Sequence, residues 1–158
     1  VIRTGALPED GVIARPLGKL TMVNCASPHY LTRFGYPQSP DDLTSHAIVR
    51  YTPHLGVHPL GFEVASVNGV QWFKSGGMLT VNSSENYLAA GLAGLGIIQI
   101  PRIAVREALR AGRLIEVLPG YRAEPLSLSL VYPQRRELSR RVNLFMQWLA
   151  GVMKEHLD

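Results

Sequence analysis

An α/β fold, in which helices cover the faces of a sheet, is predicted by three observations. Helix-like and strand-like segments alternate over residues 82–118, a pattern typical of α/β domains with parallel strands. Short β-rich pieces separated by Gly, Pro and Asn fill residues 46–81. The longest predicted helix, which Ser139 caps, carries one apolar stripe and therefore needs a sheet to cover.

Strands and short helices are predicted in the first half of the chain. Two apolar runs within residues 12–25, separated by a proline and a glycine, indicate two strands joined through a bend. Ser27 is suited to cap a helix over residues 28–34, which Gly35 ends, and a helical turn is predicted over residues 40–43. Short strands are then predicted over residues 47–51, 61–66, 70–73 and 78–81.

The dipeptide Asn68-Gly69 is a strong hairpin signal within this β-rich stretch. Apolar residues then follow helical spacing over residues 82–95, and two glycines end that helix. A buried strand over residues 97–100, a helix that begins at Pro101 and a strand over residues 114–118 follow. The alternation predicts that these strands run parallel.

The end of the chain is predicted to form one strand and one long helix. Leucine and tyrosine alternate with serine over residues 126–132, which predicts a strand with one buried face. The helix should pack on a sheet completed by upstream sequence, because its apolar side chains need more cover than residues 1–5 give. Its apolar stripe consists of Val142, Phe145, Met146, Leu149, Val152 and Met153.

Charge and cysteine content favour a cytoplasmic protein that does not itself bind nucleic acid. The net charge is +4, but the 16 basic residues are scattered among 12 acidic ones without a dense run. A single cysteine, Cys25, excludes an internal disulfide. No stretch reaches the roughly 18 apolar residues of a membrane span, so no membrane partner is expected. The chain opens on Val1 without an initiator methionine, which suggests a fragment with sequence missing upstream.

The sequence offers no catalytic machinery, so an enzyme is not expected. Ser75 does not lie between glycines as the nucleophile of a serine hydrolase would, and it is interpreted as a loop residue. Cys25 follows an apolar run, where a small buried thiol is the default. Asp41 and Asp42 fall in a first helical turn, where acidic side chains stabilise the helix dipole.

Neither a metal nor a cofactor is predicted. His54 and His58 have the spacing of a helical zinc site, but the intervening glycine and the following proline disfavour a helix, and no further ligand lies nearby. His29 and His46 are interpreted as a surface residue and a hydrogen-bonding residue at a strand edge. Three glycines match neither a phosphate loop nor a dinucleotide fingerprint and are interpreted as packing and helix-exit residues: Gly91, Gly94 and Gly96.

An ordered series of segments resembles the second half of the effector-binding domain of LysR-type bacterial transcriptional regulators. Each segment is short, but their order and spacing agree over nearly all 158 residues. The segments are Ile2-Arg3-Thr4-Gly5, Ile13-Ala14-Arg15-Pro16-Leu17-Gly18, Cys25-Ala26-Ser27-Pro28-His29-Tyr30-Leu31, Asp42-Leu43, Val81-Asn82-Ser83, Ala93-Gly94-Leu95-Gly96-Ile97, Ile100-Pro101, Gly112-Arg113-Leu114, Val131-Tyr132-Pro133 and residues 145–149.

The resemblance implies a two-lobed fold like that of type 2 periplasmic binding proteins. Residues 1–25 and 126–158 would form the remainder of the first lobe, including two crossover strands, and residues 26–125 would form the second lobe. Part of the first lobe would be missing. The family's winged helix-turn-helix would also lie outside this sequence, so DNA is expected as a partner only through that segment.

The function implied is that of a cytoplasmic sensor, in which a small-molecule effector between the lobes biases the DNA-binding domains. Family members commonly pair through these domains, so a homo-oligomer, a dimer or a tetramer, is expected. The alternative is a solute-binding protein of a transporter, because transport proteins share this architecture. An enzyme of unknown class is a third alternative.

The effector site is placed at Arg3-Thr4-Gly5 on one lobe and Asn82-Ser83-Ser84 on the other, positions that face the cleft in the family. Asn82 followed by Glu85 is interpreted as a helix N-cap with a reciprocal acid, and simple capping is the competing interpretation. A helix start also offers free backbone N–H groups, so an anionic or carboxylate effector would fit there. Arg3 could pair with the same anion, or it could form a structural salt bridge.

Overall fold

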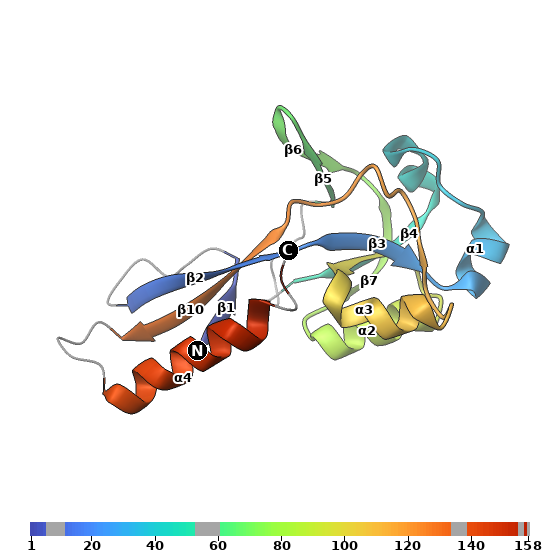
Figure 1. Cartoon of the computed structure of the whole chain (residues 1–158). Coiled ribbons are helices and arrows are strands. Elements are labelled where there is room, and N and C mark those ends of the chain that lie inside the picture. Colours follow the sequence, from blue (N-terminus) through green and yellow to red (C-terminus); the bar gives the residue numbers. More distant parts are fainter. Residues whose placement is uncertain (6–11, 53–60, 134–138, 155–156, 158) are drawn as a thin grey trace. The chain divides into compact units, whose positions relative to one another are not determined.

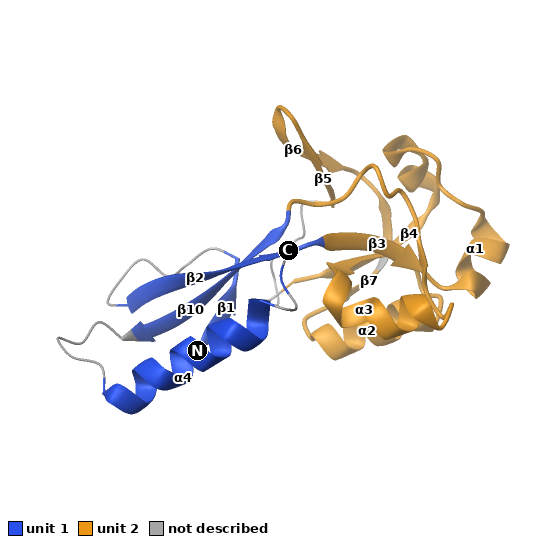
Figure 2. Cartoon of the chain, in the orientation of Figure 1, with its two compact units in different colours: residues 1–21, 125–158 blue, residues 22–124 orange. Residues whose placement is uncertain are grey.

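The computed structural model of the protein describes residues 1–5, 12–52, 61–133, 139–154 and 157. The chain divides into two compact units (Figure 2). Unit 1 comprises Val1–Thr21 and Pro125–Asp158, and unit 2 comprises Met22–Glu124. Both units combine β-sheet with helix, so the predicted α/β class is confirmed.

Unit 1 is a three-stranded antiparallel sheet with one long helix packed along it (Figure 1). Strand β10 (Leu126–Pro133) lies in the centre, between β1 (Ile2–Thr4) and β2 (Val12–Leu20). Helix α4 (Arg140–Lys154) contacts β2. The two ends of the chain therefore meet in a single sheet.

The central strand β10 is buried on both faces in its middle. Leu128 and Leu130 are 4% exposed, as their alternation predicts, but Ser129 and Val131 are only 7% exposed. The prediction of a single buried face is wrong for this stretch, because side chains that point to opposite faces of β10 are all buried there.

Helix α4 begins at its predicted cap but buries little of its apolar stripe. The side-chain oxygen of Ser139 accepts a hydrogen bond from the backbone N–H of Val142 at 3.4 Å. Met146 is buried, whereas Phe145 and Trp148 are 55% and 61% exposed, with their ring centroids 5.7 Å apart. An apolar edge of this helix is thus uncovered in the described part of unit 1.

The central strand of unit 2 is β3 (Met22–Ala26), which pairs antiparallel with both β8 (Ile98–Pro101) and β9 (Ile115–Glu116). Strand β4 (Ala47–Tyr51) pairs parallel with β7 (Gly76–Val81). Strands β8 and β9 run parallel to each other, as predicted, because each is antiparallel to β3. They are not neighbours in the sheet, since β3 lies between them.

Helices α2 (Ser84–Leu92) and α3 (Arg102–Arg110) pack on one face of the unit 2 sheet (Figure 1). Helix α2 ends before the predicted Leu95, which is 51% exposed. Gly94 adopts a φ of 76° after the last turn, and this conformation ends the helix. The core beneath the two helices contains Val23, Cys25, Val49, Tyr87, Ala90, Ile98, Ile100, Val105, Ala108 and Leu114.

The other face is covered by α1 (Pro28–Phe34), the 3-10 helix η1 (Pro40–Ser45) and the hairpin of β5 (Phe62–Ser66) and β6 (Gly69–Phe73). Ser27 caps α1 as predicted, since its side-chain oxygen accepts a hydrogen bond from the first turn. The hairpin turn also occurs where it is predicted. The core on this face contains Ala26, Tyr30, Leu31, Leu43, Ile48, Phe62, Val64, Ile97, Val117 and Leu118.

His46 lies between α1 and the start of β4, next to the core on this face, and it contacts α1 through a hydrogen bond with Tyr30. Its side chain is 6% exposed, and its Nδ1 lies 3.0 Å from the hydroxyl of Tyr30, which also accepts a hydrogen bond from the backbone N–H of Ala47. Burial lowers the pKa of His46 below its usual 6.5, an effect that the nearby carboxylate of Asp42 partly opposes. His46 is therefore neutral in the folded protein at neutral pH.

We expect unit 2 to lose stability in mild acid because of this histidine. As the pH falls through 6.5, the unfolded chain takes up the proton before the folded one, so the free energy of unfolding falls until the folded-state pKa is passed. Denaturant unfolding at about pH 7.5 and about pH 5 measures this change. His46→Asn should flatten the dependence, whereas His29→Asn, at an exposed position of α1, should retain it. If the free energy of unfolding depends on pH equally in the two variants, His46 is not responsible for the loss of stability in acid.

Candidate functional site

The start of α2 in unit 2 carries three of the predicted site residues, Asn82, Ser83 and Ser84. The hydroxyl of Ser83 accepts a hydrogen bond from the backbone N–H of Asn86 at 3.4 Å and donates one to Oε2 of Glu85 at 2.6 Å. The Ser83 hydroxyl lowers the pKa of the Glu85 carboxyl, which is therefore ionised at neutral pH. The side chains of Asn82 and Ser84 are exposed.

The N-cap of α2 is Ser83, so the prediction of Asn82 as the cap is wrong. Ser83 has extended backbone angles, φ −122° and ψ 136°, and its side chain bonds to the first turn. The extended chain of β7 thus continues through Asn82 before the helix begins. Helix capping alone accounts for the position of the Ser83 side chain. The Glu85 carboxylate already places a negative charge at the start of α2, so an anionic ligand bound there would lie close to a like charge.

Tyr51 is a candidate residue that sequence reasoning did not identify. It ends β4 opposite Val81 of β7, and its ring lies 5.7 Å from that of Tyr87, one turn into α2. The side chain is 44% exposed, so it is available to contact a ligand at the start of α2. Ligands of α/β proteins bind outside the carboxyl ends of parallel strands, and that rule could have identified Tyr51.

The three predicted site residues of unit 1, Arg3, Thr4 and Gly5, lie on strand β1 and just after it. Arg3 lies opposite Ser129 of β10, and Thr4 lies opposite Leu128. The backbone N–H of Gly5 donates a hydrogen bond to the carbonyl of Ser127 at 3.0 Å, and Gly5 has a φ of 80°.

Arg3 and Thr4 point to opposite faces of the unit 1 sheet, because successive side chains of a strand alternate. A ligand on one face can contact the guanidinium of Arg3 but not the hydroxyl of Thr4. Arg3 forms no ion pair with any acidic side chain in the described part of the chain. The salt-bridge interpretation of Arg3 has no support there.

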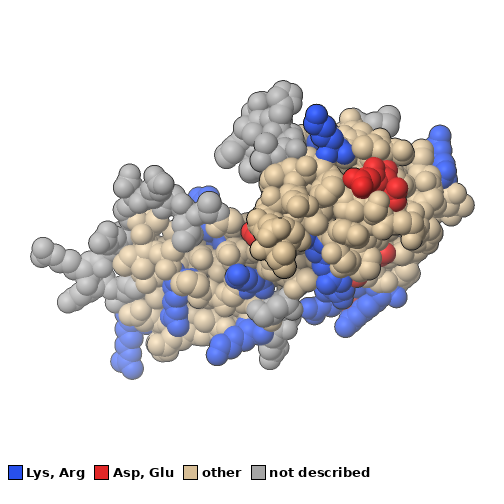
Figure 3. Space-filling model, turned by 90° about the horizontal axis from the view of Figure 1, so that it is seen from above, with Lys and Arg blue, Asp and Glu red and all other residues tan. Residues whose placement is uncertain are grey.

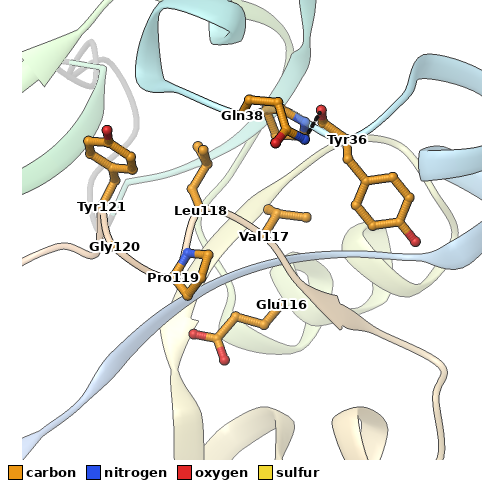
Figure 4. Close-up of a pocket in the computed structure, with 9 residues that line it drawn as sticks. Tyr36, Gln38, Glu116, Val117, Leu118, Pro119, Gly120 and Tyr121 are labelled. Atoms are coloured by element: carbon orange, nitrogen blue, oxygen red, sulfur yellow. Dashed lines mark hydrogen bonds between the residues drawn. The ribbon is translucent and has the colours of Figure 1, made fainter.

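A small pocket lies at one end of unit 2, between the loop after α1 and the loop after β9 (Figure 4). Its volume is about 230 Å³, and Tyr36 and Tyr121 lie at its two ends. Glu116, its one carboxylate, already pairs with Arg102 at 2.9 Å and with Arg122. The pocket therefore has no free charge with which to orient a ligand.

A buried amide fixes the loop that lines this pocket. Asn24 is fully buried, and its Nδ2 donates hydrogen bonds to the carbonyls of Leu118 at 3.2 Å and Tyr121 at 2.9 Å. Its Oδ1 accepts a hydrogen bond from Nε2 of Gln99 at 2.9 Å. Gln99 in turn exchanges hydrogen bonds with the backbone of Glu63 on the hairpin. Asn24 thus connects β3, β8, the hairpin and the loop through one polar network.

Cys25 is a buried core residue, as predicted. Burial, reinforced by the Glu116 carboxylate, raises the pKa of its thiol to about 12, so the thiolate is not populated at neutral pH. Gly91 is a packing glycine, because a Cβ there would lie 2.6 Å from Cδ1 of Ile98. His54 and His58 lie outside the described residues. Within the described ranges, no cluster of three or more His, Cys, Asp or Glu side chains could hold a metal ion.

Charged side chains are dispersed over the face of the protein that Figure 3 shows. On the face shown in Figure 3, lysine and arginine side chains occur on both units and are separated by uncharged residues. This distribution agrees with the interpretation of the net positive charge as a solvated surface. Among the described residues, no helix has the length and apolar character needed to cross a membrane.

Comparison with known proteins identifies the family. The LysR substrate binding domain family matches residues 1–154. The chain is 99% identical over all 158 residues to an uncharacterized HTH-type transcriptional regulator of Escherichia coli K12, of which it covers 53%. It is 34% identical over 141 residues, 89% of this chain and 48% of the other, to an uncharacterized HTH-type transcriptional regulator of Haemophilus influenzae.

The fold also matches solved regulatory domains. The regulatory domain of CrgA, a LysR-type regulator from Neisseria meningitidis, superposes with a TM-score of 0.78 at 26% identity, over 96% of this chain and 73% of that domain. The chain therefore belongs to the LysR substrate-binding-domain family, and the prediction of its two-lobed fold is confirmed. It spans about half the length of the curated relatives that it matches.

Proposed function

We propose that this chain is the effector-sensing part of a longer cytoplasmic transcriptional regulator, which binds DNA through a helix-turn-helix segment outside the chain. The observation that carries this proposal is the family match over almost the whole chain, together with relatives named as HTH-type transcriptional regulators. The same names disfavour the alternative of a transport protein. The chain is a binding module and not an enzyme, and it needs neither a metal nor a cofactor.

The effector is a small anionic molecule bound by both lobes. We assign residues 1–25 and 126–158 to the first lobe and residues 26–125 to the second. Asn82, Ser83 and Ser84, with Tyr51, contribute from the second lobe, and Arg3 and Gly5 contribute from the first. An effector that binds one arrangement of the lobes more tightly than another shifts the population toward it, and this shift is what the DNA-binding segment would detect. A homo-oligomer, a dimer or a tetramer, would present at least two such segments to DNA.

Arg3→Ala and Ser83→Ala are expected to weaken effector binding by about tenfold to a hundredfold each, which corresponds to roughly 1.5 to 3 kcal/mol for a lost charge-assisted contact. The E. coli relative, 99% identical over this chain, is a suitable full-length protein for these substitutions. The effector is first identified by a thermal-shift screen of metabolites, and its affinity is then measured by calorimetry.

Two control variants separate binding from folding. Ser139→Ala removes another helix cap, and Arg113→Ala removes another exposed arginine, both outside the proposed site. Each control should bind the effector as the parent does. If the Arg3→Ala and Ser83→Ala proteins are folded and bind the effector as tightly as the parent does, the effector site lies elsewhere.

A further inference from the structure

A chain of contacts runs from the start of α2 into the sheet of unit 2. Tyr51, at the end of β4, packs its ring 5.7 Å from that of Tyr87 on α2. Tyr87 is buried, and its hydroxyl accepts a hydrogen bond of 2.8 Å from the backbone N–H of Gln99 on β8. A side chain of α2 that contacts the candidate site is thus bonded directly to the backbone of β8.

The side chain of Gln99 carries this connection to the opposite face of the sheet. Tyr87 belongs to the core beneath α2 and α3, whereas the amide of Gln99 exchanges hydrogen bonds of 2.8 and 3.0 Å with the backbone of Glu63 in the hairpin. The same amide donates to Oδ1 of Asn24, which lies directly opposite on β3. Gln99 is therefore joined to α2 through its backbone and to β3 and β5 through its side chain.

The chain passes between the two units twice, and Asn24 lies beside the first passage. Unit 1 has its first segment end at Thr21 and unit 2 begins at Met22, so Asn24 is the third residue of unit 2. Its amide donates to carbonyls of the turn over residues 118–121, which leads toward the second passage. The backbone N–H of Val117 in turn donates to the carbonyl of Asn24 at 2.9 Å.

Glu63 and its hairpin hold the second passage, which follows Glu124, the last residue of unit 2. The Glu63 carboxylate accepts a hydrogen bond from the backbone N–H of Glu124 at 3.0 Å, and the backbone N–H of Ala65 donates to the carbonyl of Arg122 at 2.8 Å. Figure 1 shows this segment, in orange, passing the hairpin before it enters β10. The residues beside both passages are therefore bonded to groups that Gln99 holds in place.

We propose that Gln99 is a positioning residue that couples the start of α2 to both passages between the units. A change in the positions of Tyr51 and Tyr87 alters the hydrogen bond to the backbone of Gln99, and its side chain transmits the change to Asn24 and Glu63. The passages are the covalent links between the units, so how firmly they are held affects how freely the units can reorient. This proposal rests on the proposed sensing function and deepens it, because it names the residues through which an occupied site would act on these links.

The test is a double-mutant cycle in the full-length E. coli relative, measured by hydrogen exchange with mass spectrometry. Tyr51→Ala removes the ring that packs on Tyr87, and Tyr87→Phe removes only the hydroxyl that bonds to Gln99. The reporters are the backbone amides of Val117 and Glu124, one beside each branch of the network. Each substitution alone should raise their exchange rates by about threefold to tenfold, the effect of weakening one hydrogen bond. In the Tyr87→Phe background, Tyr51→Ala should add less than about twofold.

Two further variants separate coupling from a purely structural role. Leu95→Ala is the matched control, because Leu95 is 51% exposed and follows the opposite end of α2, and it should keep both reporters within about twofold of the parent. Gln99→Leu keeps a side chain of similar size without hydrogen-bonding groups. It should speed exchange at the reporters in either case, but only the loss of a coupling residue would also remove the effect of Tyr51→Ala.

The proposal is wrong if Tyr51→Ala leaves both reporters at the parental rates, or if it speeds them equally in the parent and in the Tyr87→Phe and Gln99→Leu backgrounds. These measurements use no effector, so their outcome is separate from that of the sensing function. If the cycle gives the expected result but no bound ligand alters DNA binding, the coupling is correct and the sensing function is wrong. If a bound ligand alters DNA binding but the cycle shows no coupling, the sensing function is correct and Gln99 does not mediate it.

Discussion

Asn24→Ala is expected to lower the free energy of unfolding of unit 2 by about 3 kcal/mol. The fully buried amide satisfies the carbonyls of Leu118 and Tyr121 and the side chain of Gln99. A buried polar group left without a partner costs roughly 1 to 3 kcal/mol, and alanine removes the partner of three such groups at once. Denaturant unfolding followed by circular dichroism measures the effect as a lower midpoint at an unchanged slope.

Asn86→Ala is the matched control for this substitution, because Asn86 is an exposed residue of α2. Its effect should stay within about 0.5 kcal/mol, as is usual for surface positions. If Asn24→Ala unfolds at the parental midpoint, the network does not stabilise unit 2. Hydrogen exchange should also become faster in β3 and β8, the strands that carry Asn24 and Gln99.

Phe145→Ala is expected to have very different effects in this chain and in a full-length relative. In this chain Phe145 is 55% exposed, so its loss should change the free energy of unfolding by no more than about 0.5 kcal/mol. The chain corresponds to 73% of the CrgA regulatory domain, and we expect the remainder of such a domain to cover the apolar edge of α4. In the full-length E. coli relative the same substitution should therefore cost about 3 to 5 kcal/mol.

The comparison needs a substitution that is neutral in both proteins. Val67 is fully exposed at the tip of the unit 2 hairpin, so Val67→Ala should have little effect in either. If Phe145→Ala changes the free energy of unfolding by the same small amount in both proteins, the apolar edge of α4 is not covered in the full-length protein. On the same reasoning, the complete regulatory domain should unfold at a higher denaturant concentration than this chain.

Local signals predicted most of the elements. Ser27 and Ser139 cap helices where the sequence places them, and Asn68-Gly69 forms its hairpin, because each of these signals acts within a few residues. The cap of α2 was misassigned by one position, since Asn82 and Ser83 can both cap and the extent of β7 decides between them. Local patterns do not contain that information.

Pairing between distant segments was less predictable. The alternation of helices and strands suggests that β8 and β9 run parallel, but it does not reveal that β3 separates them. The sheet of unit 1 pairs residues more than 100 positions apart, such as Lys19 and Ser127. The contact of Tyr51 with Tyr87 likewise follows from the parallel pairing of β4 with β7. Tyr51 was therefore absent from the sequence prediction of the site.

The proposed sensing function is tested most directly by the binding of the full-length E. coli relative to its own DNA sites, with and without a ligand. Chromatin immunoprecipitation identifies the sites, and nuclease footprinting with the ligand found in the thermal-shift screen gives both affinity and footprint length. The account predicts that the ligand changes at least one of these two quantities, and that Arg3→Ala reduces the change. The account would be contradicted if the protein binds discrete DNA sites but no bound ligand alters either its affinity for them or the length of its footprint.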